Sequence, residues 1–129
     1  MEVLIVEDER EIAELIRDSL KPLGMKCRIA PDAGAADRAL AERRVEAVTL
    51  DLGIPGRPGV EWLEIIAERQ PQLARRTLVI TGLDLQRELV ERLARCGAGI
   101  LAKPFSVAGL HEAARSQFAR PIHLSANLN

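Results

Sequence analysis

Short apolar runs alternate five times with longer stretches of helical periodicity, and this alternation severely limits the folds open to the sequence. Each run holds β-branched and aliphatic residues over only four or five positions, which is typical of strands buried on both faces of a parallel sheet. The runs cover residues 3–6, 27–30, 47–50, 77–81 and 98–102. Strict alternation with short links predicts an α/β fold, in which helices cover both faces of a five-stranded parallel sheet.

The stretches between the runs carry apolar residues at spacings of three and four, as amphipathic helices do. We expect helices over about residues 9–20, 32–43, 60–67, 84–95 and 106–119. Asp32, Asp84 and Ser106 stand at the starts of three of these stretches. Short oxygen-bearing side chains accept hydrogen bonds from the first helical turn, so these three residues are predicted helix caps.

Polar side chains follow four of the five predicted strands. Glu7 and Asp8 follow the first strand, Asp51 the third, Thr81 ends the fourth, and Lys103 follows the fifth. In open parallel sheets, ligands bind outside the carboxyl ends of the strands. These five side chains are therefore expected to form one site.

Clustered carboxylates repel one another unless a cation compensates them, and magnesium prefers such hard oxygen ligands. Asp8 and Asp51 are the expected direct ligands of Mg²⁺. Glu7, longer by a methylene, would act through a bound water. The backbone carbonyl of Gly53, two residues after Asp51, could face the same ion.

A carboxylate near such an ion can also serve as a nucleophile that forms an aspartyl phosphate. Phosphoryl transfer depends on positioning and charge neutralisation more than on covalent help from the protein. Asp51 stands alone at the end of the middle strand and is the predicted acceptor. Lys103 would neutralise the transferring group, and the Thr81 hydroxyl would donate a hydrogen bond to it.

Each residue also has a simpler interpretation when taken alone. Asp8 and Glu11 resemble a capping box at a helix start. Asp51 could be a turn residue, Lys103 a solvated surface charge and Thr81 an ordinary strand residue. Their joint placement at strand ends, in chain order, favours the functional interpretation.

The sequence resembles the receiver domains of bacterial two-component response regulators. The resemblance rests on the segments 3–9 and 51–59, the pair Thr81-Gly82 and the triplet 103–105, and it covers residues 1–119. It implies a receiver domain over 1–119, followed by a tail or the start of a linker over 120–129. It also implies a flavodoxin-like fold with strand order 2-1-3-4-5, the order found in chemotaxis receivers.

The resemblance further implies that a sensor histidine kinase or phosphotransfer protein phosphorylates Asp51. The protein would be a phosphoacceptor that promotes its own phosphorylation and dephosphorylation, rather than an enzyme. By the same analogy, the Lys103-Pro104 bond is expected to be cis. Two residues depart from the common pattern: Ile100 stands where receivers usually carry a switch aromatic, and Glu7 stands where many members have Asp. Signalling through Ile100 cannot take the usual aromatic form.

The composition of the chain argues against nucleic acid and membranes as binding partners. The net charge is −1, no long basic run occurs and aromatics make up 2% of the 129 residues, so direct nucleic-acid binding is not expected. No leader and no apolar stretch near the roughly 20 residues of a membrane span are present, which predicts a cytoplasmic protein without membrane contact. Cys27 and Cys96 are expected to be reduced thiols. An unknown output protein or domain is a further expected partner, and the 10 residues after 119 are too short for an output domain.

Other functions stay open at this point. A receiver-shaped interaction module that does not cycle phosphate would fit the missing aromatic. A flavin or nucleotide carrier of similar fold would need a phosphate-binding loop after the first strand, where the acids Glu7 and Asp8 stand. A phosphatase would need a second Asp where Gly53 stands. The charged stretch with Arg87, Glu91 and neighbouring residues could mediate a homodimer, although a solvated face is more typical.

Overall fold

The computed structural model describes residues 1–82 and 84–120 and contains a five-stranded parallel sheet with the order β2-β1-β3-β4-β5. The strands are β1 (Glu2–Val6), β2 (Lys26–Ala30), β3 (Ala47–Leu50), β4 (Thr77–Thr81) and β5 (Gly99–Ala102). The predicted flavodoxin-like fold and its strand order are confirmed. β2 and β5 form the two edges of this sheet.

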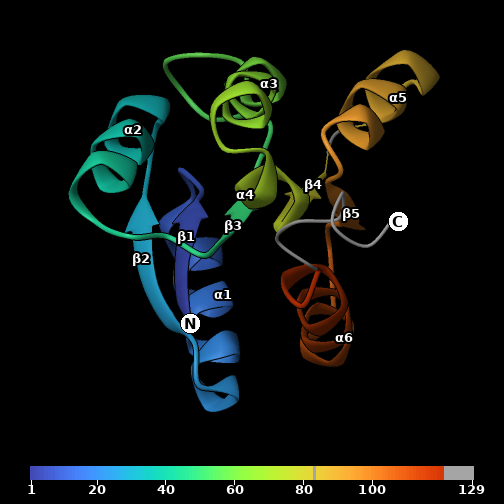
Figure 1. Cartoon of the computed structure of the whole chain (residues 1–129). Coiled ribbons are helices and arrows are strands. Elements are labelled where there is room, and N and C mark those ends of the chain that lie inside the picture. The colour runs from blue at the N-terminus through green and yellow to red at the C-terminus, as the bar shows by residue number, and fades with distance from the viewer. Residues whose placement is uncertain (83, 121–129) are drawn as a thin grey trace, which may run out of the picture.

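Helices cover both faces of the sheet (Figure 1). They are α1 (Arg10–Leu20), the 3₁₀ turn η1 (Lys21–Leu23), α2 (Ala33–Glu42), α3 (Gly59–Arg69), α4 (Pro71–Arg75), α5 (Arg87–Arg95) and α6 (Val107–Phe118). α1 and α6 pack together on one face, whereas α2, α3, α4 and α5 lie on the other.

The alternation of side chains along β1 explains how one strand serves two cores. Leu4 and Val6 belong to the core beneath α2, α3, α4 and α5, whereas Val3 and Ile5 belong to the core beneath α1 and α6. Successive strand residues point to opposite faces, so a strand that is covered on both sides must be apolar throughout. The continuous apolar runs in the sequence are therefore a direct consequence of the two helix layers.

Two of the three predicted helix caps are confirmed. The Asp32 carboxylate accepts a hydrogen bond from the Ala35 amide at 2.7 Å, and the Ser106 hydroxyl accepts one from the Gly109 amide at 2.9 Å. Both side chains stand directly before the first helical residue, where such a bond satisfies an otherwise unpaired amide.

The third predicted cap is wrong. Helix α5 begins only at Arg87, its capping position is Gln86, and the Gln86 side chain forms no cap hydrogen bond. Asp84 lies in a non-helical segment before that position, too early in the chain to act as the cap. A short helix that was not predicted, α4, begins at Pro71. Proline suits the first helical turn because its missing N–H would have no partner there.

The predicted domain boundary falls near the end of the described chain. Helix α6 ends at Phe118, and of the predicted tail only Arg120 belongs to the described residues; 121–129 lie outside them. The extent of the domain over 1–119 therefore stays a prediction. Among the described residues, no helix combines the length and the apolar character that crossing a membrane requires.

Candidate functional site

The carboxyl edge of the sheet brings three acids together. β1 and β3 pair in parallel, with Val6 opposite Leu50, and the Asp51 amide donates a hydrogen bond to the Val6 carbonyl at 2.9 Å. This register places the acids that follow both strands side by side. One carboxylate oxygen from each of Glu7, Asp8 and Asp51 lies within 4.8 Å of the others.

Lys103, which follows the edge strand β5, extends its side chain to the same acidic cluster. The Lys103 Nζ atom lies 2.8 Å from Glu7 Oε1 and 3.6 Å from Asp51 Oδ1. The side chains of these residues are largely buried, with 14% of Lys103, 2% of Glu7 and 11% of Asp51 exposed. The ammonium group therefore stands between two carboxylates in a partly desolvated pocket.

Burial dominates the electrostatics of Glu7. Desolvation raises the pKa of its carboxyl group, and the charge of Asp51 raises it further. The hydrogen bond from Lys103 and one from the Glu9 amide, at 3.1 Å, oppose this rise without cancelling it. For Lys103, burial lowers the pKa, but the hydrogen bond and charge of Glu7 together with the charge of Asp51 outweigh burial, and the pKa is raised. The lysine is therefore held in its charged form.

The capping interpretation of Asp8 is wrong. The residue at the capping position of α1 is Glu9, and its side chain forms no cap hydrogen bond. Asp8 is instead exposed, with its carboxylate directed to the acidic cluster. Such an exposed acid beside buried Glu7 and Asp51 can act as a metal ligand.

The remaining predicted residues lie around the same point. Thr81 is buried at the carboxyl end of β4, and its carbonyl accepts a hydrogen bond from the Lys103 amide at 3.0 Å. A Cβ added to Gly53 would lie 3.6 Å from Asp51 Oδ2, so Gly53 stands next to the Asp51 carboxylate. A Cβ added to Gly82 would lie 3.6 Å from Lys103 Cβ, so Gly82 packs beside the lysine stem. The Lys103-Pro104 peptide is cis, as expected.

The donor set fits a hard divalent cation. Three carboxylates gather at one point, and the Lys103 ammonium group balances only part of their charge. Magnesium typically binds through one or two carboxylates and keeps several waters, which suits a cluster that is open on the Asp8 side. The Glu7, Asp8 and Asp51 cluster can therefore bind a metal ion.

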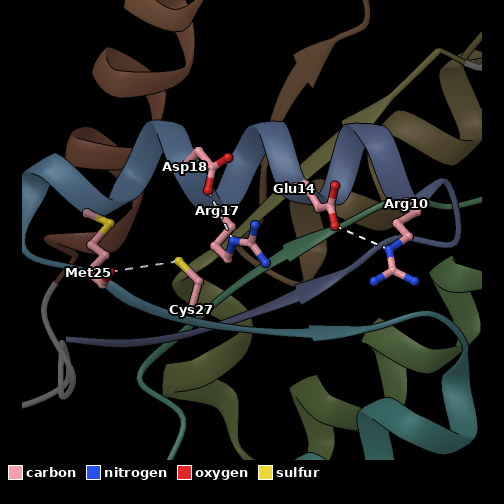
Figure 2. A network of polar contacts seen from close by, with 6 residues as sticks. All are labelled: Arg10, Glu14, Arg17, Asp18, Met25 and Cys27. Carbon is pink, nitrogen blue, oxygen red and sulfur yellow. Dashed lines mark hydrogen bonds and ion pairs between the residues drawn. The ribbon is translucent and has the colours of Figure 1, made fainter.

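Sequence reasoning missed two features of the site. The first is the pairing of Lys103 with Glu7, which is shorter than its contact with Asp51. The second is a cavity of about 350 Å³ beside the acids, whose lining includes Arg10 and Glu14. Figure 2 shows these two residues on α1, joined by an ion pair of 3.2 Å. An Arg and a Glu four residues apart lie on the same face of a helix, where such pairs form.

The two cysteines are free thiols, as expected. Burial raises the pKa of Cys27 to about 11, and its Sγ atom lies 4.0 Å from the Met25 carbonyl oxygen, beside α1 (Figure 2). Burial likewise raises the pKa of Cys96. Because the thiolate is the reactive form, neither residue has the character of a nucleophile.

A parallel sheet of order 2-1-3-4-5 with an acidic pocket and a lysine at its carboxyl edge defines the class of CheY-like signalling modules. The chain belongs to the response regulator receiver domain family, whose sequence model matches residues 3–115. The classification as a two-component receiver is thereby confirmed. Receiver domains are not an enzyme family of the usual kind, and they work together with histidine kinases.

The chain is also similar to individual proteins. The chain is 32% identical over 108 residues to the response regulator protein FleR of Pseudomonas aeruginosa, covering 84% of this chain and 22% of FleR. The receiver domain of NtrX from Brucella abortus is 29% identical, with a TM-score of 0.82. The match covers 92% of this chain and 99% of that domain. A response regulator from Burkholderia pseudomallei, crystallised with a phosphorylated aspartic acid, a calcium ion and citrate, is 24% identical, with a TM-score of 0.77. The match covers 92% of this chain and 68% of that regulator. The chain spans less than half the length of the curated relatives it matches.

Proposed function

We propose that this protein is a magnesium-dependent phosphoacceptor, in which a histidine kinase or phosphotransfer protein phosphorylates Asp51. The observation that carries the proposal is the arrangement around Asp51: its carboxylate lies beside Glu7 and Asp8 and 3.6 Å from the Lys103 ammonium group. A nucleophilic carboxylate, a metal-binding cluster and a fixed cation are the groups that phosphoryl transfer requires.

Phosphorylation of Asp51 and its later hydrolysis would each exchange one bond to phosphorus for another. An Asp51 carboxylate oxygen forms a bond to phosphorus while the bond between phosphorus and the donor's histidine nitrogen breaks, and the leaving imidazole takes up a proton. Later, water attacks the phosphorus, and Asp51 leaves as a carboxylate with inorganic phosphate as the other product. Bound magnesium would neutralise charge on the phosphoryl oxygens.

The protein's own residues have separate roles in this proposal. Glu7 and Asp8, with Asp51 and the Gly53 carbonyl, would hold the metal ion. Lys103 would exchange part of its contact with Glu7 and Asp51 for a phosphoryl oxygen, since its ammonium group already lies between the two acids. Thr81, which is buried at the end of β4, would donate a hydrogen bond from its hydroxyl to another phosphoryl oxygen. The phosphorylated aspartic acid of the Burkholderia relative supports the same chemistry on this fold.

Intact-protein mass spectrometry after incubation with acetyl phosphate tests the proposal. We expect one phosphoryl adduct in the presence of Mg²⁺, none in the presence of a chelator, and none in Asp51→Asn. An adduct that persists in the chelator or in the variant would contradict the assignment of the site. Absence of both an adduct and Mg²⁺ binding in a folded wild-type protein would contradict the phosphoacceptor role itself.

One observation favours a second candidate, an interaction module that does not cycle phosphate. Ile100, where a switch aromatic is usual, has 40% of its surface exposed on the edge strand β5. The aliphatic side chain cannot report the state of Thr81 in the aromatic manner. Mg²⁺ binding separates the candidates, because a purely structural module does not require the ion.

Homodimerisation through α5 remains a prediction, and one of its charged residues is already engaged within the chain. The Arg92 guanidinium donates two hydrogen bonds to the Glu64 carboxylate on α3, at 2.6 and 3.0 Å. This bidentate pair joins α5 to α3. A dimer contact through α5 would therefore have to use the other charges of that helix, such as the exposed pair Arg87 and Glu91.

A further inference from the structure

The loop that follows the proposed acceptor is attached to α2 at two points. Along the backbone, the Ala33 amide at the start of α2 donates a hydrogen bond to the Pro55 carbonyl at 3.1 Å. Through side chains, the Arg57 guanidinium donates a hydrogen bond to the Asp37 carboxylate on α2. Both partners in the loop lie within a few residues of Gly53, the proposed carbonyl ligand of the metal ion.

Asp37 joins three elements through one carboxylate. While one oxygen accepts the Arg57 hydrogen bond, the other accepts a hydrogen bond from the Trp62 indole N–H at 2.9 Å. Trp62 is buried in the first turn of α3, directly after the loop. The loop between Asp51 and α3 is thus fixed at its far end to a helix that packs on β1 and β2.

Two glycines allow this close approach. Gly56 has a φ of +100°, a conformation that favours glycine, and a Cβ added there would lie 3.4 Å from the Ala33 Cβ. A Cβ added to Gly59 would lie 2.7 Å from the Leu52 Cα, so the start of α3 packs directly on the loop. The loop therefore lies against both helices, with the ion pair on its solvent side.

We infer that Asp37 and Arg57 are positioning residues for the metal site: their ion pair holds the loop that carries Gly53, whose carbonyl is the proposed backbone ligand of Mg²⁺. This inference rests on the proposed function. Neither residue would touch the ion or the phosphoryl group. Their contribution would be to reduce the ordering that the loop must undergo when the ion binds.

The expected effect is modest, because 39% of the Arg57 side chain and 50% of the Asp37 side chain are exposed. An exposed ion pair stabilises a structure by an amount that corresponds to about a two- to five-fold change in an equilibrium constant. We therefore expect Arg57→Gln and Asp37→Asn each to weaken Mg²⁺ binding about two- to five-fold. Asp37→Asn retains an oxygen that can accept the Trp62 hydrogen bond, so it removes mainly the ion pair.

For Arg57→Gln, a positioning role and long-range electrostatics predict opposite changes in Mg²⁺ affinity, whereas for Asp37→Asn they predict the same direction. Loss of the positive Arg57 charge alone would strengthen the binding of a cation, and loss of the negative Asp37 charge alone would weaken it. The positioning role predicts that both substitutions weaken binding, and that the double variant binds no more weakly than either single variant. Arg28→Gln is the matched control, because Arg28 on β2 forms a similarly exposed ion pair at 2.8 Å with Glu42, the last residue of α2.

The test is a Mg²⁺ titration followed by the amide resonances of the loop, together with hydrogen exchange of the same amides without metal. We expect weaker binding and faster loop exchange in both variants and neither change in Arg28→Gln. Stronger binding in Arg57→Gln, or unchanged loop exchange, would overturn the positioning role. If the wild type binds no Mg²⁺, the proposed function fails; if it binds and the variants bind equally well, only this inference fails.

Discussion

Replacing Lys103 by Met tests how strongly the acidic pocket depends on its lysine. Methionine keeps most of the length and the apolar stem of lysine but carries no charge. In the variant, Glu7 would stay buried, with carboxylate oxygens of Asp8 and Asp51 within 4.8 Å and no ammonium group at 2.8 Å. The folded state would then hold an uncompensated buried charge, whereas the unfolded chain would not.

The magnitude follows from the burial of the pair. Removing one partner of a fully buried ion pair costs about 3–5 kcal/mol in the free energy of unfolding. Here the lysine is slightly exposed, and Glu7 keeps its hydrogen bond from the Glu9 amide at 3.1 Å. We therefore expect a loss of about 2 kcal/mol near neutral pH without Mg²⁺, on the order of 8 °C in Tm for a domain of this size.

The loss should depend on pH, and its sign follows from Glu7. Burial already raises the pKa of Glu7 above its ordinary value of 4.5. A carboxyl group with a raised pKa in the folded state makes stability fall as the pH rises from the unfolded pKa through the folded one. Without Lys103 the pKa of Glu7 rises further, so the loss is largest near neutral pH and shrinks as Glu7 becomes protonated.

Urea unfolding of the wild type and Lys103→Met, in chelator and at pH values of about 5 and about 7, measures both effects. The double variant Glu7→Gln, Lys103→Met should recover part of the lost stability, because it removes the unpaired carboxylate. Arg28→Met, in an exposed ion pair, should cost no more than about 1 kcal/mol. A loss below about 0.5 kcal/mol at neutral pH, or one that grows as the pH falls, would refute the reasoning.

Three further predictions concern other parts of the chain. Thr49→Val should raise the free energy of unfolding by up to about 1 kcal/mol in urea titrations, because the Thr49 hydroxyl is buried without a hydrogen-bond partner among the described residues; a clear loss would show that the hydroxyl is satisfied. Gly59→Ala should lower it by about 1–3 kcal/mol in the same titrations, since the new Cβ would meet the Leu52 Cα at 2.7 Å; an unchanged midpoint would exclude that clash. Cys27, with its pKa raised to about 11, should resist alkylation by iodoacetamide at neutral pH and react faster as the pH approaches 11. Mass spectrometry measures the alkylation, and rapid labelling at neutral pH would argue for an accessible thiolate.

The acidic cluster was predictable because parallel strands carry their carboxyl ends to one edge. Glu7, Asp8 and Asp51 directly follow the apolar runs of β1 and β3, so the strand assignment alone placed them together. The pairing of Lys103 with Glu7 was not predictable in the same way. It depends on the length and direction of a flexible side chain that crosses from the end of β5 to the end of β1.

Helix ends could be predicted from the sequence where a single capping side chain determines the conformation. The prediction failed where packing between distant segments determines it. Asp32 and Ser106 cap their helices through their own side chains. At α5, by contrast, the residue at the capping position forms no cap hydrogen bond, and Asp84 proved a misleading signal. The Asp37 contacts with Arg57 and Trp62 join segments 20 and 25 residues apart, and nothing in the local sequence indicates them.

The two edges of the sheet differ in how well they resist pairing with another chain. The edge strand β2 exposes the charged residues Lys26 and Arg28, and charges on an edge discourage intermolecular strand addition. The opposite edge, β5, has the sequence Gly-Ile-Leu-Ala and carries no charge within the strand. We therefore expect aggregation of partly unfolded molecules to begin at β5, and a lysine in place of the exposed Ile100 to slow it in light-scattering measurements.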